Sequence, residues 1–153
     1  MQRILVGIDF SDFTPALVEQ ARRLAAGLAA EVFLVHVAEP EPDFVGYDVG
    51  PQTVRDSVAH HLRQGHRDLQ ALADRLRADG VATTALLVDG AAADTLLSEA
   101  HRLGVELLVL GTHGHGRLHR LLLGSVGESV LRRAPCAVLF VPLAGTAPGR
   151  ATA

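Results

Sequence analysis

The sequence predicts an α/β fold in which helices cover both faces of a doubly wound, five-stranded parallel sheet. Five short apolar runs lack the alternation of half-exposed strands, which indicates strands buried on both faces. Apolar residues at helical spacing fill each interval between these runs, so the predicted order is β-α-β-α-β-α-β-α-β. The predicted strands are residues 4–8, 32–37, 83–88, 107–110 and 137–141.

The first two predicted helices have clear boundary signals. Thr14-Pro15 is a favourable start for the first helix, because proline suits an initial helical turn. Apolar residues then recur on one face over residues 17–28. A second apolar stripe covers residues 58–76, and Gly80 follows it at a position typical of a helix C-cap.

The last two helices are predicted from caps and breakers. Asp94 is expected to cap the third helix, because a carboxylate at the N-cap accepts a free backbone N–H. Gly104 is expected to end that helix. The fourth helix is predicted to begin near Ser125 and to stop before Pro135, since the residue before a proline disfavours helical geometry.

The chain is predicted to be a single domain over residues 1–142, followed by a flexible tail over residues 143–153. The connection over residues 38–52 is unusually long and rich in proline and glycine. Such a loop at the carboxyl end of a strand often lies over a site.

Composition excludes several classes of protein. The chain has 153 residues, 48% of them hydrophobic, which is enough to bury a core and excludes a disordered chain. A net charge of −3 and 4% aromatic residues argue against binding to nucleic acid. No run is long enough to span a bilayer, and no signal peptide is recognised. Cys136 is the sole cysteine, so we expect no internal disulfide and a cytoplasmic protein.

The most unusual segment follows the fourth predicted strand. Gly111, Gly114 and Gly116 allow backbone N–H groups to approach an oxyanion without a Cβ in the way. Gly124 and Ser125 then open a helix whose first N–H groups are unpaired and carry the positive end of the helix dipole. Ligands of such sheets bind beyond the carboxyl ends of the strands. We therefore expect both glycine-bearing segments, called the glycine corners below, to bind one chain of phosphates.

Two common phosphate-binding motifs are absent. Arg117-Leu118 stands where a P-loop would have lysine followed by serine or threonine. The first strand is followed by Asp9-Phe10-Ser11, which contains no GxGxxG fingerprint of a dinucleotide site.

The pattern Gly111-x2-Gly114-x9-Gly124-Ser125 resembles the G-2x-G-9x-G(S/T) motif of nucleotide-binding universal stress proteins. The resemblance extends to residues 4–11, 34–37 and 132–138 and covers about residues 2–142. It implies a Rossmann-like sheet with strand order 3-2-1-4-5. It also implies a homodimer in which Ala137–Val141 pairs with its copy.

The resemblance also implies roles for individual residues. Asp9 would lie against the ribose, with Ile8 and Phe10 lining the base and sugar pocket, and the backbone of Val37 would contact adenine. The glycine corners would hold the ribose and phosphates. The nucleotide-binding residues implied are Ile8, Asp9, Phe10, Ser11, Val37, Gly111, Thr112, Gly114, Gly124, Ser125 and Val126.

The function implied is binding of ATP, or of ADP or AMP, by a stress-responsive regulatory module. Gly127 stands where the family often has serine or threonine, which leaves open the preferred number of phosphates and the presence of Mg²⁺. A slow ATP-hydrolysing enzyme and a dimeric interaction module with a vestigial pocket are alternatives. The missing P-loop lysine argues against the first, and the complete glycine pattern against the second.

Local alternatives remain for single residues. Asp9 could cap the next helix, Ser125 could be an N-cap that serves no ligand, and Gly111 and Gly114 could be turn residues. The eight histidines lack carboxylate or cysteine partners at ligand spacing, so no metal site is predicted. Among them, His36 lies inside a predicted strand and is expected to form a hydrogen bond in the core.

Overall fold

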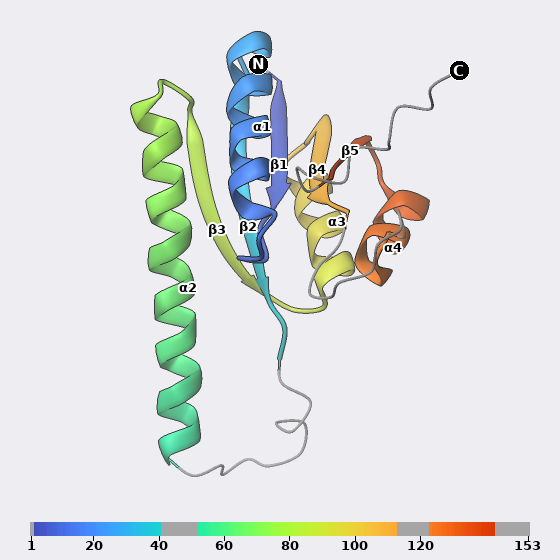
Figure 1. Ribbon diagram of the computed structural model, residues 1–153. Helices are drawn as coiled ribbons and strands as arrows, with labels where there is room; N and C mark the ends of the chain where they lie inside the picture. Colours follow the sequence, from blue (N-terminus) through green and yellow to red (C-terminus); the bar gives the residue numbers. More distant parts are fainter. Residues whose placement is uncertain (1, 41–51, 113–122, 143–153) are drawn as a thin grey trace, which may run out of the picture.

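The computed structural model of the chain describes residues 2–40, 52–112 and 123–142, and its architecture is a five-stranded parallel sheet (Figure 1). The strand order is β3-β2-β1-β4-β5, which confirms the fold class and the order expected from the resemblance. The predicted tail, most of the long loop after β2 and the residues from His113 to Leu122 lie outside the described residues.

The five predicted strands are all present, with ends that differ from the prediction by at most one residue. They are β1 (Arg3–Gly7), β2 (Glu31–Ala38), β3 (Thr83–Asp89), β4 (Leu107–Gly111) and β5 (Ala137–Val141). At the centre, Val6 pairs with Leu34 of β2 on one side and with Val109 of β4 on the other. Because β1 is central, the residues that follow it emerge in the middle of one edge of the sheet.

The four predicted helices are α1 (Thr14–Leu28), α2 (Gln52–Ala78), α3 (Ala92–Arg102) and α4 (Ser125–Arg133). Thr14-Pro15 opens α1, and Gly80 follows α2 with φ of 81°, a left-handed conformation that suits glycine. Helix α2 begins six residues earlier than Val58, where the apolar stripe starts. Its first turns are mostly polar and extend past the carboxyl edge of the sheet, so apolar periodicity could not detect them (Figure 1).

The prediction that Asp94 caps α3 is wrong. The N-cap is Ala91, and Asp94 lies within the first turn. The Asp94 carboxylate instead accepts a hydrogen bond from Arg133 of α4, with 2.6 Å between Nη1 and Oδ1. The N–H of Ala92 has no acceptor within the helix, and it donates to Oε1 of Glu39, just after β2, at 3.0 Å. A carboxylate that is distant in sequence therefore satisfies the helix start, and local spacing could not reveal it.

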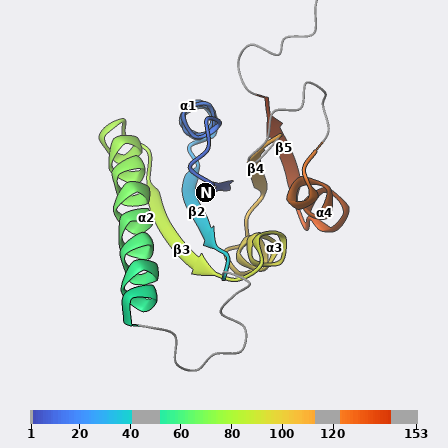
Figure 2. The ribbon, with the colours of Figure 1, turned by 60° about the horizontal axis from the view of Figure 1, so that its bottom comes forward.

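The core has two halves, one on each face of the sheet. Helices α1 and α2 cover one face and α3 and α4 the other (Figure 2). On the first face, Leu17 and Leu69 belong to one buried cluster with Leu34, while on the second Leu97 and Val130 belong to a cluster with Leu108. Both faces of the central strands are thus buried, which explains their continuous apolar runs. No helix in the described part of the chain is long and apolar enough to cross a membrane.

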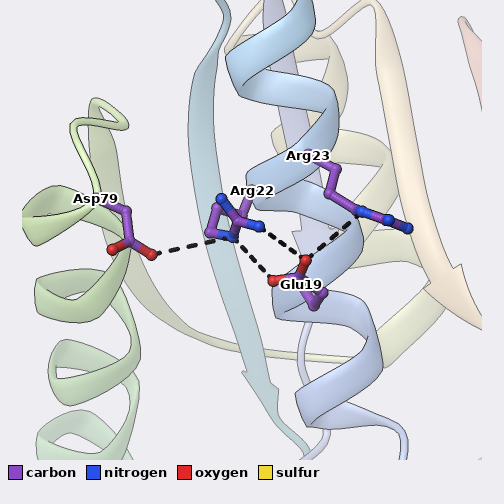
Figure 3. Close-up of polar contacts among 4 residues, drawn as sticks. All are labelled: Glu19, Arg22, Arg23 and Asp79. Carbon is purple, nitrogen blue, oxygen red and sulfur yellow. Dashed lines mark hydrogen bonds and ion pairs between the residues drawn. The ribbon is translucent and has the colours of Figure 1, made fainter.

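An exposed ion-pair network joins α1 to the end of α2 (Figure 3). Arg22 donates to Glu19 through Nε at 2.8 Å, and the same nitrogen lies 4.0 Å from Asp79. Arg23 is the second arginine beside Glu19. The hydrogen bond from Arg22 lowers the pKa of Glu19. Because these side chains face water, the network adds little to stability.

Candidate functional site

A cavity of about 350 Å³ opens at the carboxyl edge of the sheet, where β1 lies beside β4. The connections lead from β1 toward β3 on one side and to β4 and β5 on the other, so this is the point where the winding reverses. Ligands of doubly wound sheets bind at such a point. The described lining is Gly7, Ile8, Asp9, Leu17, Val35, His36, Val37, Ala92, Leu96, Leu110, Gly111, Thr112, Gly124, Ser125, Val126 and Gly127.

The corner after β4 and the corner before α4 meet at this cavity. The N–H of Gly124 donates to the carbonyl oxygen of Thr112 at 3.4 Å. The N–H of Thr112 in turn donates to the carbonyl oxygen of Val141, at the end of β5, at 3.2 Å. Backbone hydrogen bonds therefore fix both corners to the rigid sheet, and they face the same space.

The N-terminus of α4 has its first N–H groups available at the cavity. Its N-cap is Gly124, in an extended conformation, and no side chain of the described residues caps it. Ser125, Val126 and Gly127 form the first turn and line the cavity. Their N–H groups have no intrahelical acceptor, so this end of the cavity attracts an anion.

The two helices that begin at the cavity differ electrostatically. The N-terminus of α3 already receives a carboxylate, because Glu39 accepts the N–H of Ala92. No side chain of the described residues caps the N-terminus of α4, although Glu128 lies in its first turn. Among the two helix starts, an anionic ligand would therefore find available N–H donors at Ser125 rather than at Ala92.

Gly111 has a packing role that the sequence did not reveal. A Cβ built at this position would lie 3.1–3.2 Å from Cβ, Cγ and Cδ1 of Phe13, a buried core residue. The missing side chain thus makes room for the Phe13 ring beneath the strand end. A Cβ built at Gly124 would meet no atom within 4 Å. The two glycines therefore serve different physical needs at one site.

Asp9 sits on the cavity wall and shapes the turn that follows β1. Its Oδ1 accepts the N–H of Ser11 at 3.0 Å, and the hydroxyl of Ser11 accepts the N–H of Phe13 at 3.3 Å. These two side-chain turns lead the chain into α1, whose N-cap is Phe13. Asp9 therefore does not cap that helix, and its carboxylate stays exposed at the cavity.

Phe10 does not contribute to the described lining, although the resemblance placed it in the base and sugar pocket. Its ring packs against His36, with 4.8 Å between the ring centroids, and lies near Gly65 of α2. Its φ of 55° is a left-handed conformation, uncommon for an aromatic residue. The turn after β1 thus directs Phe10 toward α2 and Asp9 toward the cavity.

His36 forms the hydrogen bond expected of it. Its Nδ1 lies 2.7 Å from the carbonyl oxygen of Ile8. A carbonyl only accepts hydrogen bonds, so Nδ1 carries the proton and donates.

Most of the predicted nucleotide-binding residues lie together around the cavity. Those that line it are Ile8, Asp9, Val37, Gly111, Thr112, Gly124, Ser125 and Val126. Phe10 and Ser11 lie beside it, and Gly114 lies outside the described residues. Among the lining residues that were not predicted from the sequence are His36, Ala92 and Leu96. The two on α3 follow the apolar pattern of core residues, so no local signal distinguished them.

Comparison with known proteins places the chain in a family. The sequence pattern of the universal stress protein family matches residues 1–142. A universal stress protein of Thermus aquaticus is 32% identical over 144 residues, which cover 90% of this chain and 96% of that protein.

Solved structures agree in fold. A protein of this family from Burkholderia pseudomallei has 32% identity and a TM-score of 0.69, covering 92% of this chain and 96% of its own. A universal stress protein solved in complex with cAMP has 27% identity and a TM-score of 0.65, covering 93% of this chain and 97% of its own. On the sequence match and the shared fold together, this chain belongs to the universal stress protein family.

Proposed function

We propose that this universal stress protein binds an adenine nucleotide, ATP or else ADP or AMP, in the cavity between β1 and β4. The observation that carries the proposal is the meeting of the backbone at Gly111–Thr112 with that at Gly124, beside the N-terminus of α4, which no side chain of the described residues caps. The cavity volume of about 350 Å³ is within the usual range for small-molecule sites. The family relative that was solved with cAMP supports a nucleotide as the ligand.

The orientation of the nucleotide follows from the charges of the cavity wall. The phosphates would bind at Ser125 and Val126, because the dipole of α4 and its free N–H groups favour negative charge. Asp9 would accept hydrogen bonds from the ribose hydroxyls, since its carboxylate is exposed at the cavity. The base would lie toward Val37 and the start of α3, where Glu39 already neutralises the helix end.

We propose binding without efficient turnover. Asp9 is the one carboxylate among the described lining residues, and its Oδ1 already accepts the N–H of Ser11. A hydrolase would need a group that orients the attacking water. Any Mg²⁺ that accompanies ATP would be held mainly by phosphate oxygens and water. Slow hydrolysis is the alternative, and a turnover lost in Asp9→Ala would favour it.

The regulatory part of the proposal concerns assembly and cellular role. We propose a cytoplasmic homodimer that responds to stress and forms through β5, Ala137–Val141. Within the described residues β5 pairs with β4 on one edge only, so its other edge can accept a strand. Thr112 lines the cavity and also bonds to Val141 at the end of β5. Nucleotide binding could therefore change the dimer affinity through this bond.

Isothermal titration of the purified protein with ATP tests the proposal, and saturable binding is the expected result. Mass spectrometry of the denatured protein should identify any nucleotide that was bound during expression. Gly124→Val should abolish binding while the protein stays folded, because the new side chain enters the open space of the cavity. Gly27→Val is the matched control, since Gly27 also faces open space but lies far along α1. Absence of binding at millimolar ATP would refute the proposal.

A further inference from the structure

The ladder between β1 and β2 stops one hydrogen bond early, beside the cavity. The last paired residues are Gly7 and Val35, and the N–H of Ile8 still donates to the carbonyl of Val35 at 2.8 Å. In a continued parallel ladder, the next bond would join the N–H of Val37 to the carbonyl of Ile8. That bond is not formed: Ile8 and His36 are not paired, and Nδ1 of His36 donates to the Ile8 carbonyl at 2.7 Å.

The main-chain groups of Val37 face β1 at a level where β1 and β2 are no longer paired. The carbonyl of Val35 points toward β1 and accepts the N–H of Ile8. The carbonyl of Ala38 points toward β3 and accepts the N–H of Gly90, just after that strand. Because these directions alternate along a strand, the N–H and C=O of Val37 both point toward β1. Val37 also lines the cavity. A half-buried N–H in this position requires a partner from water or a ligand.

We propose that His36 is a positioning residue for the adenine contact that the family resemblance assigns to the backbone of Val37: its imidazole donates to the Ile8 carbonyl, so the N–H and C=O of Val37 are not used by the ladder and remain available to the base. The inference rests on the proposed function. Adenine presents an acceptor at N1 beside a donor at N6, which complements one backbone N–H and one C=O. Hypoxanthine presents the reverse, a donor at N1 and an acceptor at O6, so the same pair would reject it.

The surroundings of His36 hold its ring in place. The Phe10 ring packs against it at a centroid distance of 4.8 Å, with the Phe10 backbone in a left-handed conformation. Gly65 of α2 lies beside it, and a Cβ built there would make an ordinary contact at 3.9 Å with Cδ2 of His36. The imidazole therefore acts as a fixed donor rather than a mobile surface group.

The test compares ATP with ITP, which has the same charge and the same phosphates. Titration calorimetry on the full chain should show that the wild-type protein prefers ATP by about tenfold or more. His36→Leu removes the donor, so Val37 can close the ladder onto Ile8. In this variant the ATP affinity should fall and the preference should shrink to about twofold or less. His36→Asn keeps an N–H donor near the Nδ1 position and should retain most of the preference.

Amide hydrogen exchange provides a measurement that needs no variant. In the ligand-free wild-type protein, the N–H of Val37 should exchange faster than that of Val35, which is bonded within the ladder. ATP should slow the exchange at Val37, and His36→Leu should slow it without ligand.

Two results with His36→Leu or the free protein would overturn the inference. One is an unchanged ATP preference in His36→Leu, whether or not both affinities fall equally, and the other is a Val37 amide as protected as that of Val35 in the free protein. A wild-type protein that binds ATP and ITP equally would overturn the role of His36 but not the proposed nucleotide binding. A wild-type protein that binds neither would overturn the proposed function as well.

Discussion

The N–H of Gly124 donates to the carbonyl oxygen of Thr112 across the mouth of the cavity, at 3.4 Å. This bond joins the end of β4 to the start of α4. It explains how two glycine-bearing segments that are separate in sequence line one cavity. Because Thr112 is also bonded to Val141, the site is tied to the edge strand of the sheet.

Gly111→Ala should destabilise the protein, whereas Gly124→Ala should not. A Cβ at Gly111 would lie 3.1 Å from Cγ of buried Phe13, and overpacking of a core costs about 1–3 kcal/mol. A Cβ at Gly124 would meet open space, and replacing an N-cap glycine by alanine should change stability by less than about 1 kcal/mol. Urea denaturation measures both variants. Equal stability of the two would contradict the packing role of Gly111.

Gly27→Ala and Gly65→Ala should each stabilise the fold by about 0.5–1 kcal/mol, because glycine within a helix costs that much relative to alanine. Space is available at both positions: Gly27 of α1 has no atom near a built Cβ, and at Gly65 the nearest contacts are 3.9 and 4.0 Å. Thermal melts would show higher midpoints. A lower midpoint for Gly65→Ala alone would mean that the rings of His36 and Phe10 need more room.

Thr14→Val should leave the free energy of unfolding unchanged or raise it by up to about 1 kcal/mol, because a buried hydroxyl without a partner has lost its hydration without compensation. Oγ1 of Thr14 is buried and has no hydrogen-bond partner among the described residues. Thr83→Val is the matched control, since the buried Thr83 hydroxyl donates to the carbonyl of Val81 at 3.0 Å. That variant should lose about 1 kcal/mol. The reverse order in chemical denaturation would contradict this account.

Glu19→Gln should lower stability slightly near neutral pH and have no effect in acid. The hydrogen bond from Arg22 lowers the pKa of Glu19 in the folded protein. A lowered folded pKa stabilises the protein above the unfolded-state pKa, and this contribution disappears as the pH falls through the folded pKa. Denaturation of both proteins between about pH 7 and about pH 3 measures the difference. Because these groups are exposed, added salt should also reduce it. A difference that grows in acid would contradict the sign.

Much of the fold could be predicted because burial on both faces leaves a direct mark on sequence. Residues 32–37 and 137–141 are nearly continuous apolar runs, and both form strands. Helix ends were predicted where a local signal decides them, as at Gly80. The start of α3 was mispredicted because Glu39, remote in sequence, satisfies it in place of Asp94. The early start of α2 was missed because its first turns carry no apolar stripe.

The sequence by itself determined the order of elements, the family and the two glycine corners, since periodicity and spacing are local properties of the chain. Only the tertiary structure decided that Gly111 makes room for Phe13, that Phe10 turns toward α2, and that His36 replaces a ladder bond at Ile8. These contacts join residues from different elements. They depend on directions in space that no residue spacing encodes, because packing and hydrogen-bond geometry are set by the assembled sheet and its helices.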